Sequence, residues 1–379
     1  MTIAVVGVTF SVAVSSVAMA TAIALWVYML LMFSPRSISR TPLDIYFLCY
    51  AMAEILSTIF AVEPAASFVN MKRLFLIAIV YLVCVSIDTE FKLKGVLWLL
   101  VGVGALLSFL EIFSIYSIRG HFMRVSLFQY FLTEGGIKMF LLLLALPFVF
   151  HPSTPRNWRI GTAACSLPLM VGLILTQTRS AWLGLLAGTL TIGFLRNKYA
   201  ILFIIILVVI VLFAAPLDYR TRAASIIDPT DRSNLARIHM ITTGWKMFLD
   251  HPIFGVGDID LKKIYVTYIT PIDSGEGGHL HNNFMTLLVT LGFVGIAATM
   301  ALFVKIFLME FGIARFTRQH WLLGSLSLGS LAGYIGFHVN GLFEWNFGDH
   351  EIAVLLWFTV GLSLVSRRLH SLPEEGGTT

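Results

Sequence analysis

The sequence predicts an all-α polytopic membrane protein, and three observations lead to this fold class. Hydrophobic residues make up 58% of the 379-residue chain and charged residues only 12%, whereas about a quarter of the residues in soluble domains are charged. Polar interruptions recur at intervals of roughly 20 residues, which is the length of a helix that crosses a bilayer. The sequence lacks the period-two alternation that is typical of an outer-membrane barrel.

We expect about twelve membrane-spanning helices, because a helix satisfies its own backbone hydrogen bonds within lipid. The first 33 residues carry no charge, so they lack the basic start of a cleavable signal peptide and are long enough for two closely packed spans. Gly7 and the serines near Ser15 would permit a tight turn between these two. The other ten apolar blocks are residues 43–60, 73–88, 95–114, 136–150, 160–177, 180–195, 199–216, 282–309, 321–340 and 350–366.

Basic residues predict how these spans are oriented in the membrane. If both termini are cytoplasmic, every loop on the cytoplasmic side carries two basic residues, as the positive-inside rule requires. These residues are Arg36 and Arg40, Lys92 and Lys94, Arg156 and Arg159, Arg196 and Lys198, Arg315 and Arg318, and Arg367 and Arg368. The connections near residues 63–70, 115–135 and 177–180 then lie on the opposite side of the membrane.

One long insertion, also on the opposite side, divides the chain into four parts. We expect spans 1–9 in residues 1–216, the insertion in residues 217–281, spans 10–12 in residues 282–366, and a cytoplasmic tail in residues 367–379. The insertion is the only segment with the composition of a soluble protein. At this length its own basic residues escape the positive-inside rule.

An amphipathic helix of about five turns is predicted within the insertion. Asp231 to Asn234 offer N-cap residues, and Pro252 ends the helix. We expect this helix to lie either on the membrane surface or on the bundle of spans. The apolar residues at helical spacing are Leu235, Ile238, Ile241, Trp245, Phe248 and Leu249.

His281 is the leading candidate for a catalytic group. It follows the glycine-rich segment Gly275–Gly278 and directly precedes an apolar span that begins at Asn282. A neutral imidazole can accept a proton near physiological pH, so it can act as a general base. The alternative is that His281 only caps the helix or forms a hydrogen bond at the membrane interface.

His279 stands two residues before His281, and a His-x-His pair can also bind a metal ion. A metal site needs at least one further ligand, and the nearest acidic residues, Asp273 and Glu276, lie on the glycine-rich segment. We therefore expect no metal here. His279 is expected to shape the loop or to bind substrate.

Two arginines are candidates for binding a phosphate-bearing ligand. Arg179 lies between two predicted spans, where an arginine usually faces a cavity or an anionic partner, although it could also extend to the interface. Arg237 lies on the amphipathic helix away from its apolar stripe, and an ordinary solvated arginine is the alternative there. The guanidinium fork suits phosphate oxygens and keeps its charge. With Arg220, Arg222 and Arg232, these residues would attract an anionic lipid head group.

Further polar residues could support the same site. His338 and Glu344 belong to a polar group around the connection between the last two spans, and they could either line the cavity or anchor the interface. Arg73 and Arg124, near two other connections on the same side, are weaker candidates of the same kind.

No cofactor, metal or nucleic acid is expected. The sequence contains no Walker loop, dinucleotide fingerprint or paired Asp-x-Asp, and no basic stripe with interleaved aromatic residues. Cys49, Cys84 and Cys165 all lie in apolar segments, unlike metal ligands or a disulfide framework.

Three segments of the chain carry recognisable motifs. They are Thr178–Trp182 around Arg179; Ser233–Asn234 with Arg237, Trp245 and Phe248–Gly257; and His281–Asn282 followed by Gly292–Gly295. In this order, the segments resemble the bacterial O-antigen ligase and polymerase superfamily of membrane glycosyltransferases. Together with the many spans and the long insertion, the likeness covers most of the chain.

The resemblance implies transfer of a glycan from undecaprenyl pyrophosphate to a sugar hydroxyl, on the periplasmic side of the bacterial inner membrane, without ATP or metal. Carried over to the matching positions, His281 is the general base and Arg179 and Arg237 bind the pyrophosphate, with His279 and Asn282 as further substrate-binding residues. The partners implied are the lipid-linked donor, a lipid A-core acceptor and membrane lipids. We expect an inverting O-antigen ligase.

Two alternatives stay open. A polymerase would join lipid-linked repeat units instead of using lipid A-core as acceptor. A transporter of lipid-linked glycans would place polar residues or broken helices at the middle of many spans, whereas here the informative polar residues gather on one face. A purely structural scaffold explains the fewest of these features.

Overall fold

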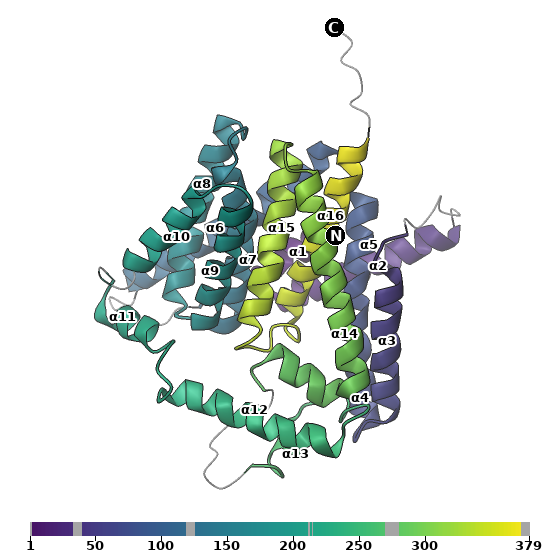
Figure 1. The fold of residues 1–379 in the computed structure, drawn as a ribbon. Coiled ribbons are helices and arrows are strands. Elements are labelled where there is room, and N and C mark those ends of the chain that lie inside the picture. The colour runs from purple at the N-terminus through teal and green to yellow at the C-terminus, as the bar shows by residue number, and fades with distance from the viewer. Residues whose placement is uncertain are drawn as a thin grey trace.

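The fold is a bundle of helices, seen in a computed structural model that describes residues 2–32, 40–118, 126–210, 213, 215–269 and 280–372 (Figure 1). Within these ranges the chain forms no strand. The helices are α1 (Thr2–Gly7), α2 (Val12–Met32), α3 (Asp44–Ile59), α4 (Pro64–Asn70), the 3-10 helix η1 (Met71–Ile77), α5 (Ala78–Ser86), α6 (Glu90–Ile118), α7 (Phe131–Phe150), α8 (Arg156–Leu175), α9 (Arg179–Leu195), α10 (Tyr199–Val209), α11 (Leu217–Ala224), α12 (Arg232–Asp250), α13 (Lys262–Tyr265), α14 (Asn283–Phe316), α15 (Trp321–Asn340) and α16 (His350–Ser371).

The prediction of many apolar helices is confirmed, but the count of twelve spans is not. Each of the ten apolar blocks after residue 40 coincides with a helix. In the described parts of the chain, seven helical segments are long and apolar enough to cross a membrane. Three shorter apolar helices are α9, α10 and Val12–Tyr28 within α2. The seven are Pro64–Ser86, Glu90–Ser114, Phe131–Phe150, Arg156–Leu175, Asn283–Phe316, Trp321–Asn340 and His350–Ser371.

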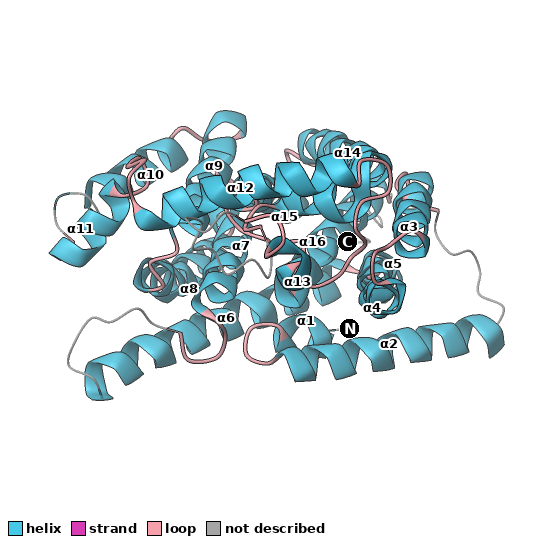
Figure 2. Cartoon of the chain, turned by 90° about the horizontal axis from the view of Figure 1, so that it is seen from below, coloured by secondary structure: helices cyan, strands magenta, loops and turns pink. Residues whose placement is uncertain are grey.

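The two spans expected in residues 1–33 are not confirmed. The turn after Gly7 forms as expected, but α1 has only six residues, which is too short to cross a bilayer. The following helix, α2, lies across the bundle instead of along it (Figure 2). Hydropathy gives a helix its length, but packing against neighbours sets its tilt.

The centre of the bundle consists of α7, α15 and α16, which are buried on nearly all sides. Small residues let α9 approach α15 closely, because a Cβ atom on Gly184 or Gly188 would meet a backbone carbonyl of α15 at 2.7 or 2.8 Å. Such small-residue contacts are a common way for helices to pack in membranes.

A buried ion cluster joins α6 and α7 inside the bundle. Lys138 donates to Glu111 at 2.6 Å and to Glu134 at 2.8 Å, and all three side chains are almost completely buried. No pattern in the sequence had indicated this cluster. An ammonium within a span is tolerated because the two carboxylates surround it.

The basic loops gather at one end of the bundle, where α16 ends. There His320 contacts Glu90 at 3.1 Å. Arg368 donates to the carbonyls of Cys84 and Ile87 at the end of α5, and Arg196 and Arg318 lie close together. The insertion lies across the opposite end (Figure 1). This separation agrees with the grouping of loops expected from the positive-inside rule.

The predicted amphipathic helix is confirmed as α12. Its N-cap is Asp231, whose carboxylate accepts hydrogen bonds from the backbone N–H groups of Ser233 and Asn234. The side of α12 that packs on the protein carries Met240, Thr243, Gly244 and Met247. The predicted apolar stripe points away from the protein: Leu235, Ile238, Ile241, Trp245 and Leu249 are all exposed.

The insertion is fixed to the bundle at a break in α14. At Gly292 the backbone has φ 64° and ψ −166°, so it leaves the helical conformation. The loop after α12 replaces the lost hydrogen bonds: Val256 and Gly257 donate to the carbonyls of Val289 and Thr290, and Phe293 donates to the carbonyl of Pro252. The glycine motif Gly255–Gly257 thus packs against the glycine motif that begins at Gly292.

Substituting Gly255 tests this junction. Gly255 has φ +73°, and a Cβ atom there would lie 2.4 Å from the carbonyl oxygen of Thr290. We expect Gly255→Ala to lower the free energy of unfolding by at least about 1–3 kcal/mol, seen as a lower thermal midpoint in detergent. The control is Gly312→Ala, also in α14, where a Cβ atom meets nothing within 4 Å. Equal thermal midpoints for the two variants would show that the contact between the loop after α12 and α14 does not contribute to stability.

Candidate active site

His281 lies at the insertion end of the bundle, immediately before α14, and contacts a buried carboxylate. Its Nδ1 atom lies 2.7 Å from Oε1 of Glu344, which is 5% exposed and comes from the connection between α15 and α16. The backbone of His281 has φ +44°, a conformation that few non-glycine residues adopt. Such an outlier is held by the surrounding structure and is typical of functional sites.

Asparagines connect the start of α14 to the α15–α16 connection and so place His281 beside Glu344. Asn283 is fully buried, and its side chain donates to Asn346 and accepts from the backbone N–H of Phe347. Asn282 accepts from the backbone N–H of Met285 and donates to the carbonyl of Leu342 at 2.8 Å. Asn282 therefore caps α14 and fixes the connection; its contact with substrate stays a prediction.

The contact between His281 and Glu344 sets the chemistry of the imidazole. An ionised carboxylate can only accept a hydrogen bond, so this contact favours, in a neutral imidazole, the tautomer with the hydrogen on Nδ1 and the lone pair on Nε2. A carboxylate in this position also stabilises the imidazolium that forms when Nε2 takes a proton, as in other His–carboxylate pairs. The sequence had suggested Glu344 only as one of several supporting residues.

A basic groove of about 440 Å³ opens on one side of His281. Three arginines face one aspartate along it, and two of the arginines come from α12. Arg237 donates to the carbonyl of Phe343 at 3.0 Å and to the hydroxyl of Ser233 at 2.8 Å, which fixes its guanidinium near His281. The lining residues are Arg222, Asp231, Arg232, Ser233, Ala236, Arg237, Met240 and His281.

Burial and neighbouring positive charges disfavour the charged form of two arginines of the basic groove. Burial lowers the pKa of the Arg222 guanidinium, and the nearby charge of Arg179 lowers it further. Burial also lowers the pKa of Arg237, which Glu344 opposes. Both shifts mean that the cations are less well stabilised than in water, so an anionic ligand would bind here favourably.

Arg179 lies behind the groove and not along it. It is 7% exposed, and it donates to Ser225 at 2.7 Å, to Asp231 at 3.0 Å and to Asn234 at 3.1 Å. Burial acts against ionisation of Asp231, but the hydrogen bonds and charge of Arg179 lower its pKa overall. Arg179 thus anchors the start of α12 to α9, and the direct phosphate contact expected from the sequence stays a prediction.

An acidic cavity of about 630 Å³ lies on the other side of His281. Four carboxylates line it against one arginine and one lysine, and His281 and Met240 belong to both the cavity and the basic groove. Its polar and aromatic lining residues are Asn70, Arg73, Tyr130, Thr133, Asp258, Asp260, Lys262, His281, Thr286, Thr290, Glu344, Trp345 and Asp349.

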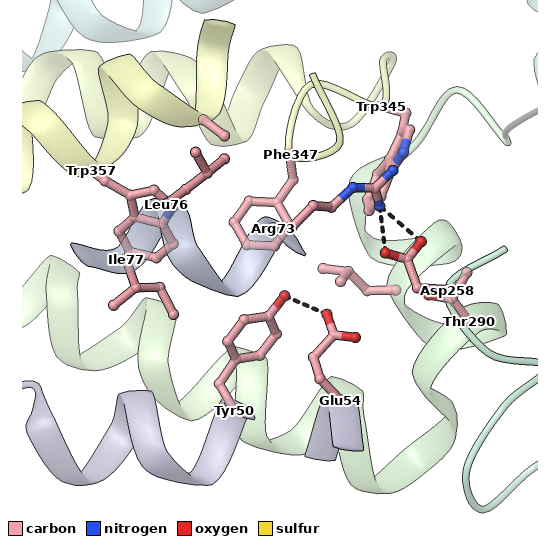
Figure 3. A pocket seen from close by; sticks show the side chains of 12 residues that line it. Tyr50, Glu54, Arg73, Leu76, Ile77, Asp258, Thr290, Trp345, Phe347 and Trp357 are labelled. Carbon is pink, nitrogen blue, oxygen red and sulfur yellow. Dashed lines mark hydrogen bonds and ion pairs between the residues drawn. The ribbon is translucent and has the colours of Figure 1, made fainter. Parts of the chain in front are cut away.

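Arg73 contributes to this cavity through an ion pair. Its Nη1 atom lies 2.8 Å from both oxygens of Asp258, and its guanidinium lies 5.8 Å from the ring centre of Trp345 (Figure 3). Burial raises the pKa of Asp258, and the pairing with Arg73 opposes this shift. Behind the pair is an internal cavity of about 20 Å³ beside Tyr50 and Glu54, roughly the size of one water molecule.

The other predicted site residues lie elsewhere. His338 is packed among the rings of Phe284, Phe303, Tyr334 and Phe337 and lines neither the groove nor the cavity. His279 and Arg124 lie outside the described residues. Within the described ranges, no group of three His, Cys, Asp or Glu residues is placed to hold a metal ion.

Sequence reasoning missed Asp258 altogether. Its only local signal is its position directly after the Gly255–Gly257 turn. The turn brings Asp258 to Arg73, which is 185 residues away in the chain.

These features define a polytopic helical membrane protein with a His–carboxylate pair between a basic groove and an acidic cavity. Residues 163–300 match the family model described as O-antigen ligase. The match confirms the resemblance to the O-antigen ligase and polymerase superfamily, and its range includes Arg179, Arg237, His281 and Gly292. It supports a membrane enzyme of the ligase or polymerase type. No curated protein matches the chain.

The raised pKa of Asp349, a residue that lines the acidic cavity, can be tested through the pH dependence of stability. Burial raises the pKa of its carboxyl from 3.8 to about 7. The charges of Glu351 and Glu344 add to this shift, whereas the hydrogen bond from Thr133 and the charge of Arg73 oppose it. Because the folded protein then binds this proton more tightly than the unfolded chain, the contribution of Asp349 to stability falls as pH rises from about 4 to about 7.

We therefore expect the thermal midpoint of Asp349→Asn to decline less than that of the wild type between about pH 5 and about pH 8. The measurement is thermal unfolding in detergent across this range. Parallel midpoint curves for the two proteins would contradict the raised pKa.

Proposed function

We propose that this protein transfers a glycan from undecaprenyl pyrophosphate to a sugar hydroxyl of lipid A-core, at the periplasmic face of the bacterial inner membrane. The single observation that carries the proposal is the position of His281, paired with Glu344, at the junction of a basic groove and an acidic cavity. One side suits a pyrophosphate, the other can hold an acceptor, and a base stands between them.

In the proposed reaction, Nε2 of His281 takes the proton of the acceptor hydroxyl, and the hydroxyl oxygen attacks the anomeric carbon of the donor sugar. The bond between that carbon and the phosphate oxygen breaks, and undecaprenyl pyrophosphate leaves from the opposite side, which inverts the anomeric centre. Glu344 stabilises the imidazolium, as the carboxylate of a catalytic triad does. Pyrophosphate is already a good leaving group, so arginines that stabilise its charge can replace a metal ion.

The basic groove supplies those arginines. Arg237 is fixed nearest to the base by its hydrogen bond to Phe343, the residue before Glu344. Arg222 and Arg232 would bind the remaining phosphate oxygens. In this proposal Arg179 acts through Asp231 and Asn234, which it holds in place at the start of α12.

An apolar groove beside the basic groove suits the polyprenyl chain. It has a volume of about 310 Å³ and lies between α8, α9, α10 and the segment that begins with α11. Helix α11 joins the two grooves, because Arg222 lines the basic one while Ala223 and Ala224 line the apolar one. A lipid with a pyrophosphate head group and a long apolar chain would match this continuity.

Replacing His281 or its partner tests the base. We expect His281→Ala to reduce transfer by about 10²–10⁴-fold or more, and Glu344→Gln to reduce kcat within the same range, because a general base contributes that much. The assay combines purified protein with undecaprenyl-pyrophosphate glycan and lipid A-core, without ATP and with a chelator present. His281→Ala with the wild-type rate would refute the assignment of the base.

The same assay distinguishes a ligase from a polymerase and tests whether the protein is a transferase at all. Product that requires lipid A-core supports the ligase. A ladder of products from donor alone supports the polymerase. No product under either condition would reject the enzymatic function.

Substitutions of Arg237 and Arg179, the two arginines predicted to bind the pyrophosphate, should affect activity and stability differently. Arg237→Lys keeps the charge but loses the guanidinium fork, so we expect a higher KM for the donor with an unchanged thermal midpoint. Arg179→Lys loses several of the hydrogen bonds that anchor α12, so we expect a lower thermal midpoint together with lower activity. If Arg179→Lys raised only the donor KM, Arg179 would be a direct ligand instead of an anchor.

A further inference from the structure

The acidic cavity and the basic groove differ in charge although they meet at the same residues. His281 and Met240 line both, yet three arginines and one aspartate line the groove. The cavity has four carboxyl groups beside Arg73 and Lys262; one of the four, Asp258, is paired with Arg73, and burial raises the pKa of another, Asp349, to about 7. A cleft with an excess of one sign of charge concentrates ligands of the opposite sign and repels those of the same sign. A negatively charged ligand is therefore favoured in the groove and disfavoured in the cavity.

The carboxylates of the cavity are placed to accept hydrogen bonds. Asp349 accepts from the hydroxyl of Thr133 at 2.9 Å, and Asp260 accepts from the backbone N–H of Lys262 at 3.0 Å. Each carboxylate has about four lone-pair positions, so these contacts leave capacity to accept from further donors. Sugar hydroxyls are such donors.

A second, independent feature of the cavity also indicates a polar ligand. Thr286 is 2% exposed and lines the cavity, and its hydroxyl has no hydrogen-bond partner among the described residues. A buried hydroxyl without a partner costs free energy. A ligand hydroxyl in the cavity can supply that partner.

Aromatic rings complete the lining. Trp345 follows Glu344 in the chain, and its ring centre lies 5.8 Å from the guanidinium of Arg73. Tyr130 also lines the cavity and is exposed. Aromatic faces pack well against the apolar C–H faces of a sugar ring while the surrounding polar groups bind its hydroxyls.

We infer that the acidic cavity is the acceptor subsite and that it selects an acceptor whose terminal sugar carries no negative charge. This inference rests on the proposed transferase function and adds the chemical class of the acceptor. Like charges across an interface exclude wrong partners more strongly than matched charges stabilise the right one. The carboxylates thus reject a phosphorylated or acidic sugar, and they also keep the donor's pyrophosphate in the basic groove.

The test compares two lipid A-core acceptors that differ only by a phosphate on the terminal sugar, at a hydroxyl other than the one that is glycosylated. We expect kcat/KM for the neutral acceptor to exceed that for the phosphorylated one by about tenfold or more, and the ratio to shrink at high salt. Asp260→Lys, at an exposed position, should reduce the ratio several-fold. Lys246→Glu is the matched control, because Lys246 is exposed on α12 and lines neither the groove nor the cavity.

Binding of the soluble core oligosaccharides to His281→Ala gives a readout that does not need turnover. Tighter binding of the neutral oligosaccharide, weakened by Asp260→Lys in that background, supports the inference. Equal affinities and equal kcat/KM values overturn it while leaving the transferase intact. Absence of transfer to both acceptors, with charge-selective binding retained, rejects the proposed function and keeps the subsite.

Discussion

The arrangement of this protein depends on the break in α14 at Gly292. A helix that continued unbroken would use its own carbonyls; instead, those of Val289 and Thr290 accept hydrogen bonds from the loop that follows α12. Backbone groups inside a membrane protein must be satisfied, so loop and helix can only form together. The insertion is thereby fixed at one place on the bundle, and the acidic cavity is formed between the two.

The second constraint is the network of asparagines at the start of α14. Asn282 and Asn283 connect this helix end to the α15–α16 connection, and Asn283 and Asn346 are fully buried. Buried amides with satisfied hydrogen bonds specify one geometry, because any shift leaves a polar group without a partner. The result is a His281 with an unusual backbone conformation held against Glu344, in a form that can take up a proton and stabilise it.

Opposite charges on the two sides of His281 would direct the two substrates to different sides of this residue. The proposed donor brings a pyrophosphate and the proposed acceptor brings hydroxyls, and each is attracted to one side and disfavoured on the other. Arg179 supports this division indirectly, because its ion pair with the partly buried Asp231 fixes the helix that carries Arg237. An arginine that looks like a ligand in sequence can therefore contribute by holding another arginine in place.

The sequence by itself determined the helical membrane class, the ten apolar helices after residue 40, the basic loops at one end, and the Asp231-capped helix of the insertion. These follow from composition, periodicity and capping, which act over a few neighbouring residues. It also placed His281 at the start of a span. It gave no indication that α2 lies across the bundle, because hydropathy predicts the length of a helix and not its tilt.

Only the tertiary structure decided which groups meet. His281 contacts Glu344 across 63 residues, Arg179 contacts Asp231 across 52, and Arg73 contacts Asp258 across 185. No local pattern encodes such pairs, since each depends on how the helices pack and where the insertion is fixed. For the same physical reason, the opposite charges of the groove and the cavity emerge only when residues from the insertion, α14 and the α15–α16 connection come together around His281.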